Sequence, residues 1–145
     1  MILKFINVFV SFGLILILSI ACDKHKILSQ EEAIKLAEQF IRDNGYSSFP
    51  ADTSKLSYEL FDGLEKDIEI LLKSRHNTLQ IKAFCIAGNE EQWHIGFLSA
   101  DIKLLELDSI QRQSDLSGRA VIVNKHGTEI RIAHKTPSFS YFKKL

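Results

Sequence analysis

The sequence predicts an α+β fold: an N-terminal helix, with or without a second helix, packs on an antiparallel sheet of three to five strands. Three observations predict this fold class. Apolar residues recur at helical spacing between residues 30 and 44. Apolar and polar residues then alternate over much of residues 79–134, as they do in half-buried strands. Turn-like stretches separate these runs, as hairpins require. Helices that precede antiparallel strands are typical of α+β domains.

The first helix is expected over residues 30–44. Ser29 and Glu32 form a capping-box sequence, in which the hydroxyl and the carboxylate each accept a hydrogen bond from a backbone amide at the helix start. The apolar face of this helix consists of Ala33, Leu36, Ala37, Phe40 and Ile41. Gly45 is expected to end it, because glycine readily adopts the left-handed conformation of a C-terminal cap.

Between the first helix and the later strands, we expect a loop, a short strand and a second helix. Residues 46–55 are rich in serine and other turn formers, which predicts a loop. Alternation over residues 56–60 predicts a short strand. Asp62 and Glu65 together are a candidate cap for a helix that ends near Arg75. The buried stripe of this helix would contain Leu64, Ile68, Leu71 and Leu72.

A first hairpin is expected around the turn at residues 88–91. The strand before it, 79–87, is apolar on both faces over most of its length, which is typical of a central strand. The strand after it, 92–97, alternates and is half-buried. We expect Trp93 on this strand to be a core residue.

A second hairpin is expected near the C-terminus. Residues 120–123 form its first strand, 124–127 its turn and 128–134 its second strand. Between the hairpins, residues 99–117 are compatible with either a short helix or an irregular strand. After the second hairpin, a tail at 138–145 carries three aromatic residues that are expected to pack on the domain: Phe139, Tyr141 and Phe142.

The chain begins with a basic and then apolar segment. Lys4 is its only charge before Asp23, and a 16-residue apolar stretch follows, shorter than the roughly 20 residues of a membrane-spanning helix. These features predict a signal peptide at residues 1–21. The end of the segment, Ser19 to Cys22, resembles the lipobox of bacterial lipoproteins, although Ser19 stands where that motif usually has Leu, Val or Ile. An uncleaved single-pass anchor is the alternative interpretation.

The lipobox resemblance implies that Cys22 carries the lipid anchor, with fatty acids such as palmitate, and that residues 22–28 are a short tether. It also implies a location in the bacterial cell envelope, either on the periplasmic side of the inner membrane or at the outer membrane. Residues 29–145 then form a single α+β domain. Lipidation of Cys22 would leave Cys85 as the only free thiol, expected to be a small buried residue of a strand.

Charge and motifs restrict the function. The net charge is zero, so a nucleic-acid partner is not expected. Spaced histidine or cysteine motifs for a metal and a nucleophile elbow are missing from the sequence, and we predict no catalytic residue, metal ion or cofactor. Acidic residues gather at 59–69 and basic residues at 119–144, which indicates either solvated faces or a polarised surface for a protein partner. The candidate partner-binding residues are Arg119, Arg131 and Lys135.

Four stretches carry a resemblance to a known group of domains: LSQEEAIKLAEQFIRDNGY (28–46), RHNTLQIKA (75–83), the pair Trp93 and Phe97, and GRAVIVNKHGTEIRIAH (118–134). Their layout is similar to PepSY-like and cystatin-like immunity-protein domains. This resemblance implies an N-terminal helix across an antiparallel sheet, and a protein that binds and blocks one toxin.

Two functions follow as hypotheses. In the first, the chain is a non-enzymatic, membrane-tethered binding protein of the immunity type, which inhibits an envelope-acting bacterial toxin. In the second, it is an envelope accessory lipoprotein that binds a peptide, an enzyme or a cell-wall component, as the PepSY-like resemblance implies. An enzyme is the weakest of the three classes considered, because no catalytic constellation is visible in the sequence.

Overall fold

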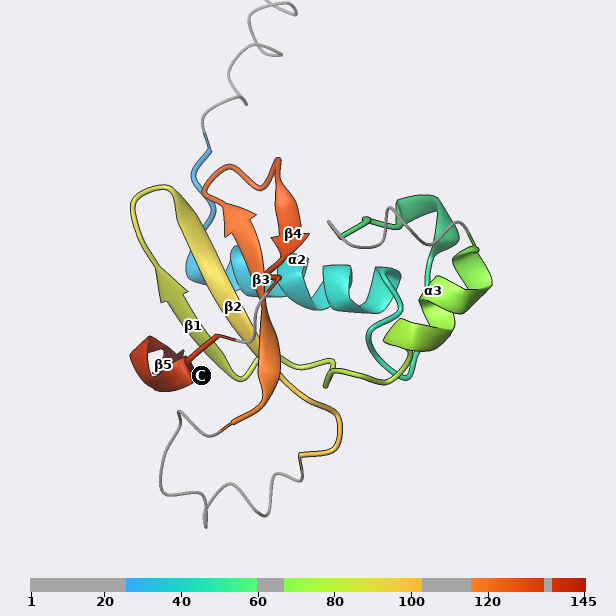
Figure 1. Ribbon diagram of the computed structural model, residues 1–145. Coiled ribbons are helices and arrows are strands. Elements are labelled where there is room, and N and C mark those ends of the chain that lie inside the picture. Colours follow the sequence, from blue (N-terminus) through green and yellow to red (C-terminus); the bar gives the residue numbers. More distant parts are fainter. Residues whose placement is uncertain (1–25, 60–66, 103–115, 135–136) are drawn as a thin grey trace, which may run out of the picture.

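The computed structural model describes residues 26–59, 67–102, 116–134 and 137–145 (Figure 1). Within these ranges it contains the helices α2 (Gln30–Asp43) and α3 (Ile68–Arg75) and the short 3-10 turns η1 (Thr53–Lys55) and η5 (Phe139–Tyr141). Its strands are β1 (Cys85–Gly88), β2 (Gln92–Leu98), β3 (Gly118–Asn124), β4 (Ile130–Ile132) and β5 (Lys143–Lys144). They form one antiparallel sheet in the order β4-β3-β2-β1-β5, which confirms the predicted α+β class.

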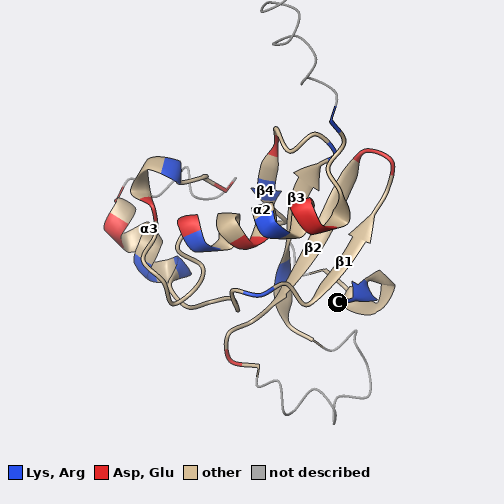
Figure 2. Cartoon of the chain, turned by 180° about the vertical axis from the view of Figure 1, so that it is seen from behind, with Lys and Arg blue, Asp and Glu red and all other residues tan. Residues whose placement is uncertain are grey.

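The main core lies between α2 and one face of the sheet. Its fully buried members are Ala33, Ala37 and Ile41 of α2, Ile95 and Phe97 of β2, and Val121 and Val123 of β3. Along the outer side of α2, basic and acidic residues alternate (Figure 2). These residues recur at helical spacing in α2 and at every second position in β2 and β3, so the apolar pattern of the sequence indicates the faces that the structure buries.

The capping box forms as predicted. Ser29 Oγ accepts a hydrogen bond from the backbone N–H of Glu32 at 3.2 Å, and Glu32 Oε2 accepts one from the backbone N–H of Ser29 at 2.9 Å. Both groups satisfy amides that have no partner inside the helix. At the other end the helix stops at Asn44, and Gly45 takes the left-handed conformation with φ of 79°.

We expect Ser29→Ala to lower the free energy of unfolding by about 1 kcal/mol, because it removes an N-cap acceptor. Urea unfolding of the detergent-solubilised full-length chain, followed by the fluorescence of Trp93, the only tryptophan, measures this loss. Ser48→Ala, at an exposed loop position, is the matched control and should change the midpoint little. Equal midpoints for the two variants would contradict the capping role.

The predicted strand at 56–60 is wrong for residues 56–59, and Leu60 lies outside the described residues. The backbone here forms hydrogen bonds with side chains instead of with a neighbouring strand. The N–H of Ser57 donates to Asn44 Oδ1 at 2.6 Å, and its carbonyl accepts from Arg75 Nη2 at 2.8 Å. Alternation cannot distinguish an extended segment fixed in this way from a strand.

Both hairpins are confirmed, but two of their strands are shorter than predicted. The strand expected at 79–87 begins only at Cys85, because the N–H of Ala83 donates to the side chain of Glu38. Before it, Leu79 forms only an isolated bridge with Ser99. The last strand spans Ile130–Ile132, since Asn124 Oδ1 accepts from the backbone of residues 128 and 129 and widens the turn.

The second helix is confirmed at its C-terminal end, Arg75. Asp67 caps its described start, while Asp62, Leu64 and Glu65 lie outside the described residues. Of its predicted buried stripe, Leu71 is buried and Leu72 is half-buried, but Ile68 is exposed. Only one side of this short helix faces the chain that follows α2, where Leu72 lies close to Gly45.

The C-terminal segment packs on the opposite face of the sheet from α2. Phe139 is buried in a second core cluster, and β5 pairs with the edge of β1. The cluster also contains Cys85, Leu98 and Leu116. Of the three aromatic residues expected to pack there, Phe139 is buried and Phe142 is partly buried, but Tyr141 is 88 % exposed. The tail of the sequence is thus part of the sheet and of the core.

The end of the predicted tether also packs on the domain. The N–H of Leu28 donates to the carbonyl of Lys125 at 2.7 Å, and its own carbonyl accepts from Trp93 Nε1 at 3.3 Å. In the part of the chain that the structure describes, no helix is both long and apolar enough to cross a membrane. The predicted signal peptide and Cys22 lie outside that part.

Candidate functional site

The structure places the two described candidates for partner binding, Arg119 and Arg131, on opposite faces of the sheet. Arg119 lies on the face of the sheet that α2 covers, because it alternates with Val121 and Val123. Arg131 pairs with Ile122 and points to the other face. Lys135 lies outside the described residues. Arg119 takes part in a polar cluster at the end of the sheet.

This cluster centres on Glu59. Arg119 Nη2 donates to Glu59 Oε2 at 2.6 Å, and the Tyr46 hydroxyl donates to Glu59 Oε1 at 2.5 Å. Arg119 also donates to the carbonyl of Ala133 through Nε and Nη2. Both side chains of the ion pair are largely shielded from water, at 25 % and 17 % exposure, so solvent screens their attraction weakly. The cluster therefore joins the loop after α2, the extended segment at 57–59 and the start of β3.

Arg75 forms the buried base of the cluster, at 4 % exposure. Its guanidinium lies 4.8 Å from the centre of the Tyr46 ring. Nη1 donates to the carbonyl of Asn44 at 3.3 Å, and Nη2 donates to that of Ser57. A single planar side chain thus fastens three segments at once, a geometry that suits arginine better than lysine.

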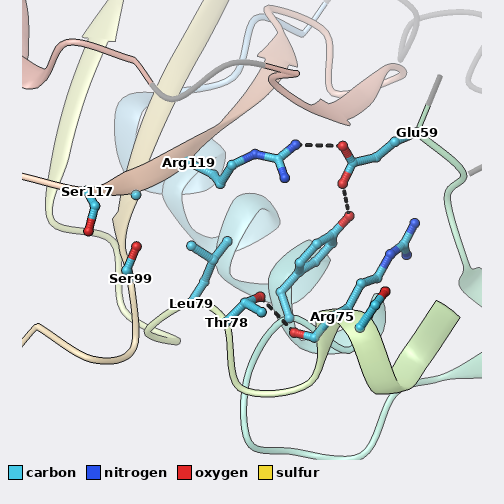
Figure 3. A pocket seen from close by; sticks show the side chains of 10 residues that line it. Glu59, Arg75, Thr78, Leu79, Ser99, Ser117 and Arg119 are labelled. Carbon is cyan, nitrogen blue, oxygen red and sulfur yellow. Dashed lines mark hydrogen bonds and ion pairs between the residues drawn. The ribbon is translucent and has the colours of Figure 1, made fainter. Parts of the chain in front are cut away.

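A pocket with a volume of about 310 Å³ opens beside these groups (Figure 3). It is lined by Tyr46, Glu59, Ser74, Arg75, Thr78, Leu79, Ser99, Ser117, Gly118 and Arg119. Ligand sites in proteins start at about 300 Å³, so this pocket suits a small group rather than a large cofactor. Its described lining carries two arginines against one carboxylate.

Some donors in the pocket are not used within the described residues. Arg119 Nη1 has no hydrogen-bond partner there, and Figure 3 shows it pointing away from Glu59, toward the other lining side chains. Ser99 and Ser117 line the opposite wall (Figure 3), where the backbone N–H of Ser99 donates to the carbonyl of Ser117 at 3.0 Å. Neither hydroxyl has a hydrogen-bond partner in that part of the chain. The Thr78 and Ser74 hydroxyls, in contrast, donate to backbone carbonyls of α3.

Burial raises the pKa of two side chains, Tyr46 and Cys85. It raises the pKa of Tyr46 well above its usual range, and the hydrogen bond to Glu59 raises it further, so Tyr46 stays a neutral donor. Burial raises the pKa of the Cys85 thiol to about 12, which keeps it protonated and unreactive at neutral pH. This agrees with the prediction that Cys85 is a small buried core residue.

A second hollow of about 270 Å³ adjoins the first and shares Glu59 as a wall. It lies between the extended segment at 57–59 and the edge strand β4, and Arg131 and His134 line its other side. Within the described residues, no group of three or more His, Cys, Asp or Glu side chains is placed to hold a metal ion.

Sequence reasoning missed Tyr46, Glu59 and Arg75 as members of one site. Neither their spacing nor their residue types form a motif. The hydrogen bonds that bring them together span 13 residues, from Tyr46 to Glu59, and 31 residues, from Asn44 to Arg75. The sequence feature that points to this site is Tyr46, an aromatic residue directly after the cap glycine Gly45. Protein-family models, curated proteins and solved structures were compared with the chain, and none of them matches it.

Proposed function

We propose that the chain is a membrane-tethered, non-enzymatic binding protein of the bacterial cell envelope, and that it inhibits an envelope-acting toxin in the manner of an immunity protein. A lipid on Cys22 holds it at the membrane. Its partner is a protein, which it blocks by occupying the partner's surface. The pocket beside Arg119 is the part of the domain that meets this partner.

One observation carries the proposal: the tether and the pocket lie at opposite ends of the sheet. The tether ends at Leu28, which is bonded to Lys125, just past the C-terminal end of β3. The pocket lies at the other end of the same strand, at Gly118 and Arg119. A seven-residue strand spans about 20 Å. Figure 1 shows the first described residues leaving the body at one end and α3 lying away from them.

Rigid attachment of the tether supports this arrangement. The Trp93 ring donates to the carbonyl of Leu28 and is covered by Lys125, whose Nζ lies 3.1 Å from the ring centre. Leu28 also packs against Gly127, where an added Cβ would lie 2.9 Å from its side chain. A domain fixed in this way holds one end toward the membrane and presents the pocket outward, where a partner can reach it.

The chemistry of Glu59 supports binding rather than catalysis. A general base needs a carboxylate that is free to accept a proton from a substrate. Both oxygens of Glu59 are engaged, one by Arg119 and one by Tyr46. Its role in the geometry is to position these two side chains at the pocket wall.

We expect Cys22→Ala to abolish incorporation of a labelled fatty acid into the chain, while Cys85→Ala retains it. The two variants are matched because they remove the only two cysteines one at a time. The readout is metabolic labelling in a bacterial host, followed by isolation of the full-length protein. Label on Cys22→Ala, or none on the unaltered chain, would refute the lipid anchor.

The inhibitory role is tested by deletion of the gene and competition with sibling cells that retain the toxin. We expect the deletion strain to lose viability, and the unaltered chain, but not Cys22→Ala, to restore it. An envelope defect with normal survival would instead favour an accessory protein that binds a peptide, an enzyme or a cell-wall component. The small volume of the pocket is the observation that favours this second candidate, because it suits a single peptide side chain.

A further inference from the structure

We infer that the outer edge of β4 binds an extended segment of the protein partner, which joins the sheet as an additional antiparallel strand. This segment carries an acidic residue opposite Arg131 and a basic residue opposite Glu129. The inference rests on the proposed function for one point, that the chain is tethered to a membrane and meets a protein. The mode of recognition is argued from β4 itself.

β4 is the last strand on its side of the sheet. Within the described residues it pairs with β3 only, whereas β5 covers part of the opposite edge, at β1 (Figure 1). An edge strand presents N–H and C=O groups that another strand can bind. In complexes of this kind the backbone hydrogen bonds supply affinity and the side chains of the edge supply specificity.

The pairing of β4 with β3 directs the backbone of Ile130 and Ile132 outward. The N–H of Ala133 donates to the carbonyl of Ala120, and the carbonyl of Glu129 accepts from β3 in the same way. In an antiparallel pair, such hydrogen-bonded positions alternate with positions that face away. The N–H and C=O groups of Ile130 and Ile132 therefore point away from β3, and they form no hydrogen bond within the described residues. An added antiparallel strand would bind these four groups.

A hollow borders this edge. The space of about 270 Å³ described above lies between the end of β4 and the extended segment at 57–59. Its far wall includes Tyr58, whose side chain is 55 % exposed and can contact a bound segment. The hollow shares Glu59 with the larger pocket. A segment that lies along β4 would therefore reach the end of the sheet that the proposed function assigns to the partner.

The side chains of the edge determine which segment fits. Glu129 and Arg131 are exposed, lie on one face two positions apart, and form no ion pair within the described residues. Opposite charges directly across two strands stabilise the pair, and like charges destabilise it. An antiparallel segment that reads acid, apolar, base from its N-terminus places the acid opposite Arg131 and the base opposite Glu129. Its apolar residue lies opposite Ile130, which packs against the main core.

β4 itself has this order of residues, Glu129-Ile130-Arg131, but the tether disfavours a second copy as the occupant. In two copies paired through β4, the two β3 strands would run in opposite directions. Each tether ends beside Lys125, just past the C-terminal end of its β3, so the two tethers would lie at opposite ends of the joined sheet. Anchorage of both chains to one membrane requires the tethers at the same end. A separate protein therefore suits this edge better.

Two peptides of the same composition test the inference. Acetyl-Thr-Glu-Val-Arg-Thr-amide places opposite charges across from β4 in an antiparallel pair, and acetyl-Thr-Arg-Val-Glu-Thr-amide places like charges there. Each is titrated into the detergent-solubilised full-length chain at low salt and followed by amide NMR. We expect the first peptide to bind about tenfold tighter than the second. It should also slow hydrogen exchange at the amides of Ile130 and Ile132.

Equal affinities, tighter binding of the second peptide, or protection of other amides instead would overturn the inference. Protection of Ile130 and Ile132 that rises with the concentration of the chain alone would assign the edge to a second copy, and would overturn it as well.

Exchange of the two charges on β4 should reverse the preference. In the double variant Glu129→Arg/Arg131→Glu, the second peptide should bind about tenfold tighter than the first. Both side chains are exposed, so the fold should tolerate the exchange. The matched control Glu31→Lys/Lys35→Glu exchanges an exposed pair on α2 and should keep the original preference. An unchanged preference in the β4 variant, or a reversal in the control, would contradict recognition by β4.

These results are distinguishable from failure of the proposed function. The expected peptide preference, together with normal survival of the deletion strain, would retain the strand-binding edge and reject the immunity role. Sensitivity of the deletion strain without any peptide preference would retain the immunity role and reject the edge as its binding site.

Discussion

Phe139→Ala is expected to lower the free energy of unfolding by about 3–5 kcal/mol, although the residue lies only six positions from the end of the chain. Its side chain is fully buried in the second core cluster. The ring meets Phe142 edge to face, with centroids 5.5 Å apart, and Phe84 in the same manner at 6.4 Å. Truncation would leave a cavity between the sheet and the C-terminal segment, and would loosen β5 from β1.

Tyr141→Ala is the matched control for this variant. It removes another aromatic side chain two residues away, but one that is 88 % exposed, so we expect a change within about 0.5 kcal/mol. Urea unfolding monitored by Trp93 fluorescence compares the two variants. If Phe139→Ala cost no more than Tyr141→Ala, the C-terminal segment would not be part of the core.

Gly96 tests the same packing from the opposite side. A Cβ at this position would lie 2.5 Å from Cys85 Sγ and 2.6 Å from the Phe139 ring, so the ring occupies the space that a side chain would need. Gly96→Ala should therefore cost about 1–3 kcal/mol in the unaltered chain and less in the Phe139→Ala background. Additive losses would show that the two residues do not share this space.

Local signals explain what the sequence predicted correctly. The capping box needs only Ser29 and Glu32, three residues apart, and the first hairpin needs only the turn at 88–91 between two alternating runs. Periodicity also selects the buried face of α2, because helix geometry depends on neighbours within a few positions. Each of these features is complete within about 20 residues of chain.

The candidate site depends on contacts that no local pattern contains. Arg119 and Glu59 are 60 positions apart, and strand alternation correctly separates Arg119 from Arg131 only once the pairing of β3 with β4 is known. The strand expected at 56–60 failed for the same reason. An extended backbone satisfied by Asn44 and Arg75 has the same alternation as one satisfied by a neighbouring strand.

Arg75→Met is expected to cost about 3–5 kcal/mol, a loss comparable to removing a core phenylalanine. Methionine preserves much of the length and apolar character of the side chain, but it cannot donate to the carbonyls of Asn44 and Ser57. Each hydrogen bond from a charged donor contributes about 1.5–3 kcal/mol, and the contact with the Tyr46 ring adds about 0.5–2 kcal/mol. These terms are not strictly additive, because all of them involve one guanidinium.

Lys73→Met is the matched control, since Lys73 is an exposed residue of the same helix and its replacement should change stability by less than about 0.5 kcal/mol. A local measurement separates loss of the anchor from general destabilisation. Arg75 holds the segment that contains Ser57, so trypsin should cleave faster after Lys55 in Arg75→Met than in the unaltered chain or in Lys73→Met. Unchanged cleavage at Lys55 together with unchanged stability would mean that the segment beside Glu59 is positioned by other contacts. Faster cleavage would establish Arg75 as the residue that positions Glu59, and through Glu59 the guanidinium of Arg119, at the wall of the pocket.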